Sequence, residues 1–567
     1  APTNWFDIEL RGGTDYYTTT KNEKVYAGGN TSPRGLYNEG SETFYENNYS
    51  FLATARKDNL LDRLGGFVTF GGNLMMQQRT KMNASAGELL VPDLFSLNNG
   101  INKPTVTSEL IRRKMNSLYG SLQLNWDGYL FLDVTARNDW SSTMSKDNRS
   151  YFYPSVSLSG VISDMLPKIG GNMPEGFTFA KVRASYAEVG NDQLYNNYTV
   201  GKDENGNTTA APGQILFDSS VRSELIKSWE AGFDVRFLQN RLGLDFAWYK
   251  TNATRQLLNL PLDPFAGYSS RKVNAGNIQN EGLEISLNGA IFQSPDVQGF
   301  NWNATAQFSL NRNKIIDLYP GVTLYDIKTL DAIQIVAAQG SYYGDIYGQT
   351  FLRVTDKDSP HYGKVIVGDD GLPLISAEKS KVGNQSPDWM LGLTNSFSYK
   401  GFNLSFLVDF RIGGDIYSAT ASNLFVRGNA AGTVVNGERQ DFVVPNTVVR
   451  KDGGYVENSV PVTHQNYWER IGSTGNYGLP EVFTYDATNI RLRNITLGYT
   501  FNRAMLKKTP FQRLNLSATC NNVWMIHYNL PGIDPESVSA TNTNATGFEN
   551  GAAPTSRSFT FNVTVGF

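Results

Sequence analysis

The sequence contains very few of the side chains that proteins use to cross-link themselves or to hold metals. It has one cysteine, Cys520, and three histidines, His361, His464 and His527, among 567 residues. A single thiol excludes a disulfide framework within the chain, and no pair of histidines has the spacing of a zinc site. We therefore expect no bound metal and no cofactor.

Long apolar runs are also missing. No stretch approaches the roughly 20 apolar residues that a membrane-spanning helix needs, so a helical membrane protein is excluded. The net charge of −3 gives no reason to expect a nucleic-acid partner. A nucleophile elbow, a histidine-based zinc motif and a phosphate-binding glycine loop are all absent from the sequence, and we expect no enzyme activity.

What the sequence does have is strict alternation of apolar and polar residues. Residues 559–567 (FTFNVTVGF) are apolar at every odd position and polar or glycine at every even one. Because the side chains of a strand switch faces at each residue, this segment has one apolar and one polar face. A chain end of this kind, with a terminal phenylalanine, is typical of bacterial outer-membrane barrels.

Similar alternation recurs at residues 130–137, 229–237, 242–249, 302–311 and 402–411. The apolar faces are nearly free of charge, whereas the polar faces carry both signs. A charged side chain that faces lipid at mid-bilayer costs roughly 2–4 kcal/mol, so we assign the charged faces to a water-filled lumen. Pairing along the wall or with a plug is the more common role for such side chains, and direct solute contact the less common one. The candidates are Asp133, Arg137, Glu230, Asp234, Arg236, Asp245, Asp409 and Arg411.

Short and long connections alternate between these segments. Very short turns fall at Asp127-Gly128, Gln239-Asn240 and Lys400-Gly401. Short turns on one side and long loops on the other are typical of outer-membrane barrels. We predict an all-β fold, a transmembrane antiparallel β-barrel with about 16 strands in this chain, the first near residues 5–16. The long outer loops are predicted at residues 18–42, 83–113, 138–150, 190–227, 257–277, 316–387, 413–487 and 524–555.

Several segments, in order along the chain, resemble the SusC/RagA family of TonB-dependent outer-membrane transporters from Bacteroidetes. The resemblance implies a barrel of about 22 strands with a plugged lumen, energy coupling to TonB and a SusD-like surface lipoprotein as a lid. It also implies nutrient import, with oligosaccharides or peptides as substrates. The segments are 136–142 (ARNDWSS), 148–157 (NRSYFYPSVS), 181–192 (KVRASYAEVGND), 228–234 (SWEAGFD), 273–286 (VNAGNIQNEGLEIS), 490–501 (IRLRNITLGYTF) and 532–536 (GIDPE).

The chain departs from that family in one major way. The family's plug, its TonB box and its first strands have no counterpart in residues 1–567. We therefore expect this chain to be the C-terminal part of the barrel. An N-terminal plug-bearing segment or chain would supply the remainder and the contact with TonB. A smaller departure is at residues 466–470 (NYWER), where family members commonly continue Asn-Tyr-Trp with a proline-rich segment.

Two aromatic sites in the expected outer loops are candidate ligand contacts. The first is Asp139-Trp140, because tryptophan stacks well on sugar faces; its alternative role is a rim aromatic at the membrane interface. The second is Tyr467-Trp468, in a loop long enough to be functional, although packing of loop against loop explains the pair equally well. Asp534-Pro535-Glu536 is interpreted as a loop turn rather than a cation site.

Two other functions compete with the importer. A passive outer-membrane porin fits the strand count, but porins would not show the ordered family segments. A structural or adhesive surface protein fits the long loops, but no repeat or low-complexity segment supports it. We expect an integral outer-membrane protein whose long loops are extracellular.

Overall fold

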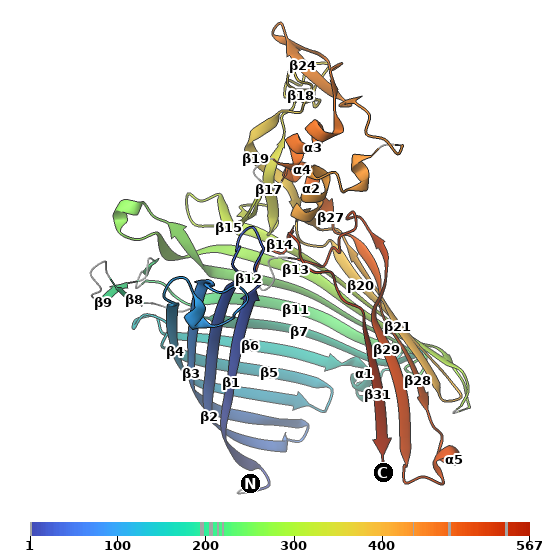
Figure 1. The fold of residues 1–567 in the computed structure, drawn as a ribbon. Helices are drawn as coiled ribbons and strands as arrows, with labels where there is room; N and C mark the ends of the chain where they lie inside the picture. Colours follow the sequence, from blue (N-terminus) through green and yellow to red (C-terminus); the bar gives the residue numbers. More distant parts are fainter. Residues whose placement is uncertain are drawn as a thin grey trace. The chain divides into compact units, whose positions relative to one another are not determined.

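The computed structural model describes residues 3–192, 198–202, 208–212, 215–217, 220–296, 298–434, 436–473, 478–538 and 543–567. Most of them are in β-strands (Figure 1). None of the helices in these residues is both long enough and apolar enough to span a membrane. The chain divides into two compact units. Unit 1 comprises Ala1–Met165, Arg183–Trp229 and Ala253–Ala275, and unit 2 comprises Leu166–Val182, Glu230–Asn252 and Gly276–Phe567.

Unit 1 is built on an antiparallel meander in which six consecutive strands pair with their neighbours in chain order. Antiparallel neighbours need only short turns, which is why the chain order and the spatial order agree. The strands are β1 (Phe6–Val25), β2 (Leu36–Leu61), β3 (Leu64–Glu88), β4 (Thr105–Trp126), β5 (Leu130–Ser141) and β6 (Ser150–Val161).

Unit 2 contains a second antiparallel meander of seven long strands, in the order β13, β14, β20, β21, β28, β29 and β31. Their bounds are β13 (Ser270–Gln293), β14 (Asn301–Asp317), β20 (Trp389–Tyr399), β21 (Phe402–Ile412), β28 (Asn489–Thr500), β29 (Arg513–Tyr528) and β31 (Ser558–Gly566). The division between the units runs through β7 (Phe177–Asn191), β11 (Glu224–Phe237), β12 (Leu242–Pro261) and β13.

All of these strands belong to one sheet, which has 17 strands within the described residues. One of them, β10 (Ile215–Phe217), is a three-residue strand that pairs in parallel with β13. The others number sixteen, so the predicted antiparallel sheet of about 16 strands is confirmed. Short strands outside this sheet include β8 (Tyr198–Lys202) and β9 (Thr208–Pro212).

The predicted short turns are confirmed by the backbone. Asp127 and Gly128 have φ angles of 53° and 74°, and Lys400 and Gly401 have 48° and 89°. Two consecutive residues with positive φ are the signature of the type I′ turn, whose twist matches that of the strands it joins. Each turn closes a ladder without a break, Trp126↔Leu130 in one case and Tyr399↔Phe402 in the other.

One face of the strands presents large apolar side chains to the outside of the protein. On β31, Phe561 is 80% exposed and Val563 is 62% exposed, and on β28 Leu497 is 55% exposed. Soluble proteins rarely leave apolar patches of this extent uncovered. Since the opposite face of the same strands is polar, the pattern is that of a β-sheet with one face in lipid.

The first strands of unit 1 are longer than the alternation predicts. β1 pairs with β2 without a break from Phe6↔Ala55 to Val25↔Leu36, so most of residues 18–42 is strand and the connection is 26–35. β3 and β4 likewise shorten the predicted loop 83–113 to residues 89–104. These strand ends carry Thr, Glu, Asn and Tyr on both faces. An apolar period therefore does not mark them, although the backbone ladder continues.

Between the other long strands, the structure has connections at residues 142–149, 192–223, 262–269, 318–388, 413–488 and 529–557. Three of them are folded. Residues 318–388, 413–488 and 529–557 carry short sheets and the helices α2 (Ala419–Val426), α3 (His464–Gly472) and α4 (Pro480–Phe483), labelled in Figure 1. The sheets are β15 (Leu324–Leu330), β16 (Ile333–Ala338), β17 (Asp345–Phe351) and β19 (Ile375–Asn384); β18 (Val365–Val367), β24 (Thr447–Lys451) and β25 (Gly454–Glu457); β27 (Thr484–Asp486), β22 (Asp415–Ser418) and β30 (Phe548–Glu549); and β23 (Phe442–Val443) with β26 (Pro461–Val462).

These three connections share one apolar core. It contains Ile333 and Ile346 from the first connection, Tyr417 and Phe483 from the second, and Phe548 from the third, all at most 4% exposed. Loops of this length with secondary structure of their own are usually functional. The helices α1 (Ile162–Lys168) and α5 (Arg503–Leu506) follow β6 and β28, each in a connection of moderate length.

Candidate functional site

In unit 1, the predicted contact residue Asp139 lies in a buried polar network at the end of β5. Its side chain is 5% exposed and accepts hydrogen bonds from Arg137 Nε at 2.9 Å and from the hydroxyl of Tyr153. Arg137 also donates to Ser117 Oγ at 2.8 Å. The carboxylate of Asp139 is thus already bonded within the protein, whereas its neighbour Trp140 is 36% exposed.

A second carboxylate extends this network. The side chain of Asp192 is 2% exposed and pairs with Arg113. It also accepts hydrogen bonds from the hydroxyls of Ser141 and Thr143. Because a buried carboxylate is costly unless donors surround it, the two aspartates and their partners fix the end of the β5–β6 hairpin.

The predicted lumen charges form pairs on the polar face. Asp133 accepts from Gln123 across the β4–β5 ladder. In unit 2, Asp234 and Arg236 lie 3.1 Å apart, and the guanidinium of Arg236 lies 4.8 Å from the ring centre of Phe179.

Two open cavities lie on this polar face. One, of about 430 Å³, is lined by Asp234, Arg236 and Asp245; the other, of about 450 Å³, is lined by serine, threonine and asparagine side chains and carries no charge. The wall therefore changes from charged to neutral polar.

Arg493 on β28 holds two carboxylates at once. It donates from Nε and Nη2 to Asp409 Oδ2 at 2.8 and 2.6 Å, and from Nη1 to Glu536 Oε2 at 2.7 Å. Asp409 belongs to the neighbouring strand β21, whereas Glu536 belongs to the connection 529–557. One guanidinium thus joins two strands of the wall to the connection 529–557.

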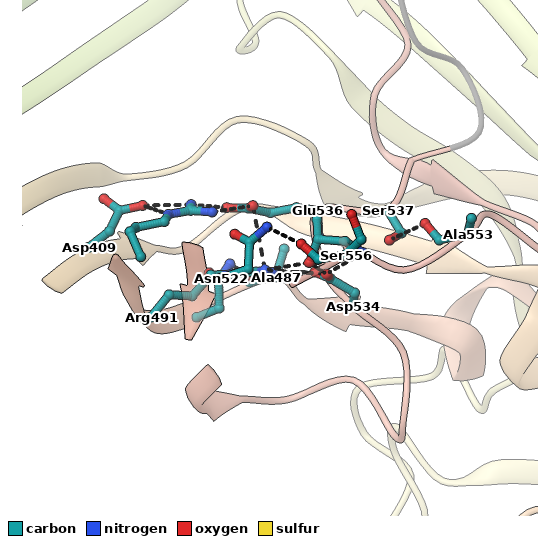
Figure 2. Close-up of polar contacts among 12 residues, drawn as sticks. Asp409, Ala487, Arg491, Asn522, Asp534, Glu536, Ser537, Ala553 and Ser556 are labelled. Carbon is teal, nitrogen blue, oxygen red and sulfur yellow. Dashed lines mark hydrogen bonds and ion pairs between the residues drawn. The ribbon is translucent and has the colours of Figure 1, made fainter. Parts of the chain in front are cut away.

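Arg491, two residues earlier on β28, pairs with Asp534 of the same connection (Figure 2). Both side chains are nearly buried, at 5% and 6% exposure. Thr555 Oγ1 and the backbone N–H of Glu536 also donate to Asp534, at 2.5 and 2.9 Å. Burial by itself raises the pKa of Asp534, but the hydrogen bonds from Arg491, Thr555 and Glu536 outweigh it and hold this pKa well below its usual range.

The connection 529–557 is fastened at further points. Asn522 on β29 donates to the carbonyl oxygen of Ser556 at 2.7 Å, and Ser537 donates to that of Ala553 at 2.9 Å (Figure 2). Gln385, which is 7% exposed, binds the backbone of the connection through Asn544 and Gly547. The connection is therefore an integral part of the wall. A cavity of about 460 Å³ beside it is lined by Arg491, Asp534 and Thr555 together with Trp524, Met525, Tyr528 and Ile533.

Arg411, another predicted lumen charge, is directed toward the connection 318–388. It donates from Nη2 to the carbonyl oxygen of Gln385 at 3.3 Å, while its buried Nε has no partner among the residues that the structure describes. Asp409 and Arg411 lie two residues apart on the same face of β21, but they have different partners.

Tyr467 and Trp468 lie on α3. Trp468 packs against the shared apolar core, and Tyr467 packs against a separate cluster of Leu372, Val444 and Val462. The ring centre of Trp468 is 4.2 Å from that of Phe425, and the ring of Tyr467 meets that of Trp468 edge-on at 5.1 Å. Burial raises the pKa of Tyr467. The indole N–H of Trp468 is buried, and none of the described residues accepts a hydrogen bond from it.

The pairing of Arg491 and Arg493 with Asp534 and Glu536 was not foreseeable from single positions. The signal was present as two segments of opposite charge, 491–493 (RLR) and 534–536 (DPE). Each places like charges two residues apart, so that the two segments match one another. In the part of the chain that the structure describes, no group of three or more His, Cys, Asp or Glu residues is arranged to hold a metal ion.

Comparisons with known proteins give the same family as the predicted resemblance. A family model described as TonB dependent receptor-like, beta-barrel, matches residues 2–523. The TonB-dependent receptor P3 of Formosa agariphila is 26% identical over 81% of this chain and 46% of that protein. The TonB-dependent receptor SusC of Bacteroides thetaiotaomicron is 24% identical over 77% of this chain and 43% of that protein. The chain thus spans about half the length of the curated relatives it matches.

Among solved structures, a chain of the RagAB peptide transporter matches all of this chain with a TM-score of 0.75 and 16% sequence identity, over 60% of its own length. At that identity the match concerns the fold alone. The family model covers most of the sequence, and the strand order and the faces of the sheet agree with it. The chain belongs to the TonB-dependent receptor family and forms part of that family's outer-membrane β-barrel.

Proposed function

We propose that this chain is the barrel wall of a SusC-like, TonB-dependent importer in the bacterial outer membrane. The observation that carries the proposal is the fastening of connection 529–557 to the polar face through Arg491–Asp534 and Arg493–Glu536. An open porin needs an unobstructed aqueous channel, whereas a gated importer needs loops that are fixed firmly to its wall. Family membership supports the same choice.

The imported molecule is proposed to be an oligosaccharide or a peptide. SusC and the RagAB peptide transporter are similar to this chain, and the polar face suits either class. The neutral cavity of about 450 Å³ offers hydroxyl and amide groups, which suit sugars, and the charged one of about 430 Å³ offers Asp234 and Arg236, which suit peptide termini. Of the predicted aromatic contacts, Trp140 is the one with an exposed side chain and is proposed to stack on the imported molecule.

The proposed partners follow from the same surfaces. A SusD-like surface lipoprotein would dock on the folded connections 318–388, 413–488 and 529–557, which we place outside the cell. An N-terminal plug-bearing segment or chain would fill the lumen beside the charged polar face and would contact TonB. The side chains Asp133, Arg137, Asp234 and Arg236 are the proposed contacts of the wall with that plug.

Uptake and conductance together test this function. The gene is deleted in its host, and uptake of fluorescent oligosaccharide and peptide mixtures is measured with and without TonB and with a proton uncoupler. We expect uptake that needs both TonB and the proton gradient, for one of the two classes. The purified protein should conduct no steady current in a planar bilayer. Steady conductance together with uptake that is insensitive to the uncoupler would identify a porin instead.

A further inference from the structure

Two arginines of unit 1 line one small cavity. The cavity has a volume of about 250 Å³, and Arg222, Arg255 and Ser223 are among the residues that line it. Within the described part of the chain, neither guanidinium has a hydrogen bond or an ion pair with any other group. Because an arginine stays protonated at any physiological pH, the cavity carries two positive charges that no group among the described residues pairs with.

The backbones of the two arginines are held together by one side chain. Asn274 accepts a hydrogen bond from the N–H of Arg222 at 2.7 Å and donates to the carbonyl oxygens of Arg222 and Arg255 at 2.8 and 2.9 Å. Arg255 has a φ of 58°, a left-handed conformation that a residue with a Cβ rarely adopts and that is found at functional sites. The pair is therefore positioned before any ligand arrives.

Further contacts join the two segments that carry the arginines. Thr254 Oγ1 donates to the carbonyl oxygen of Leu225 at 3.0 Å, and the N–H of Leu257 donates to Glu224 Oε1 at 3.0 Å. Glu224 is 7% exposed, and Asn191 donates to its second oxygen at 2.9 Å. The nearest buried carboxylate is thus satisfied by uncharged donors.

The other charges around the cavity leave the surplus positive. Glu188 lines the wall, but its carboxylate accepts from the hydroxyl of Tyr186 at 2.5 Å and lies 3.7 Å from Lys227 Nζ. Lys272 is within electrostatic range of Glu224. The hydroxyl of Ser223, a residue only 5% exposed, adds a neutral donor at the cavity wall. Guanidinium and hydroxyl groups in a fixed arrangement are the donors that recognise an oxyanion.

The position of the cavity indicates where the oxyanion comes from. Phe152 lines it and shares its strand face with Val156 and Leu158; the three are 60%, 42% and 48% exposed. Leu225, on the same wall, shares its strand face with Trp229, which is 57% exposed. The cavity therefore adjoins the apolar face of the sheet, at the strand ends joined by the long connections. Exposed tryptophan at such a border is typical of a membrane–water interface.

We propose that this cavity binds the phosphate of a lipid headgroup in the outer leaflet, with the lipid's acyl chains along the apolar face beside Phe152. The proposal rests on the membrane-embedded wall of the proposed function, but not on the imported molecule or on TonB. Basic pockets at the level of the headgroups are a known way for membrane proteins to select anionic lipids.

The test compares lipid binding by the full-length protein and by Arg222→Gln/Arg255→Gln in detergent micelles. The probes are lipid A, lipid A with its phosphates removed, and inorganic phosphate, and retained lipid is counted by native mass spectrometry. Arg312→Gln is the control, because it removes the charge of an arginine outside the cavity, one whose side chain is 46% exposed and pairs with Asp388. Asn274→Ala keeps both guanidiniums but releases their backbones. Circular dichroism and heat-modified migration confirm that each variant is folded.

We expect the double variant to bind lipid A at least about tenfold more weakly than the unaltered protein, since two charge-assisted donors are lost. Asn274→Ala should show an intermediate loss. The control and the phosphate-free lipid should show no difference between variants. Equal binding of lipid A by the folded double variant would overturn the proposal, as would equal binding of the phosphate-free lipid by the unaltered protein. Saturation by inorganic phosphate alone would assign the cavity to a free oxyanion and would overturn the lipid assignment. If the unaltered protein binds lipid A but supports no TonB-dependent uptake, that result would count against the importer only.

Discussion

Arg491 and Asp534 lie 43 residues apart in the chain and form a nearly buried, two-pronged ion pair. One side chain comes from a strand of the wall and the other from a connection, so the pair helps to hold that connection on the polar face. The predictions below begin with this contact.

Asp534→Asn should destabilise unit 2 by about 3 kcal/mol, because it leaves the buried Arg491 without a counter-charge. The measurement is urea-induced unfolding of the purified protein in lipid vesicles. Asp7→Asn is the control: Asp7 pairs with Arg56 at 3.0 Å, but the two side chains are 36% and 61% exposed, so the cost should not exceed about 1 kcal/mol. Equal effects of the two substitutions would contradict the role assigned to Asp534.

The same pair sets a pH limit. The pKa of Asp534 is lowered in the folded protein from its ordinary value of 3.8. A lowered pKa means that the stabilising contribution is complete above the unfolded value and is lost only as the pH falls through the folded value. Connection 529–557 should therefore resist pepsin at about pH 4 and become cleavable only at clearly lower pH. Asp534→Asn should remove the step, and a step above pH 4 in the unaltered protein would speak against the assignment.

Opposite faces of β31 should respond differently to a new charge. Val563→Arg places a guanidinium on the apolar face and should cost about 2–4 kcal/mol of stability in a bilayer, whereas Asn562→Arg on the polar face should cost about 1 kcal/mol or less. Folding yield into lipid vesicles, followed by protease protection, measures both. Equal yields would mean that this face does not meet lipid.

The contact between Asp139 and Tyr153 should be energetically coupled. Tyr153→Phe removes a donor from a buried carboxylate and should cost about 1–2 kcal/mol. In the double variant with Asp139→Asn the two losses should overlap by about 1 kcal/mol, which a double-mutant cycle of unfolding free energies measures. Additive losses would show that the hydroxyl does not serve this carboxylate.

Substitutions of the two aromatic candidates, Trp468 and Trp140, should have different effects on stability and on binding. Trp468→Ala removes a packed side chain from the core of the connections and should lower stability by about 3–5 kcal/mol, seen as rapid proteolysis of residues 413–488. Trp140→Ala alters a side chain that is 36% exposed and should leave the fold intact while weakening binding of the imported molecule. If Trp468→Ala is stable and weakens binding instead, Trp468 is the ligand contact.

Where the sequence alternated cleanly, it predicted the fold well. The strands at 130–137, 242–249 and 402–411 lie within β5, β12 and β21, because lipid on one side forces apolar residues onto one face. The paired ends of β1 and β2 were not predicted, because beyond the lipid neither face of a strand needs to be apolar. Residues 18–25 therefore show no alternation of apolar and polar side chains, although they are paired.

The site was predictable only in part. The charges Asp234, Arg236 and Asp409 could be assigned to the polar face by parity, but their partners could not. Asp409 pairs with Arg493 at a place where β28 has a bulge. The bulge lies opposite the step from Leu407 to Val408 in the neighbouring strand β21. A bulge redirects side chains without any sequence period. Long-range partners such as Gln385 and Gly547, 162 residues apart, also leave no local signal.

The shared core of Ile333, Ile346, Tyr417, Phe483 and Phe548 has a consequence for how such proteins can diverge or be engineered. A connection that keeps its packing partners in two others cannot be exchanged alone. Chimeras with a relative would therefore have to exchange residues 318–388, 413–488 and 529–557 together, because replacing one connection would leave the other two without their packing partners.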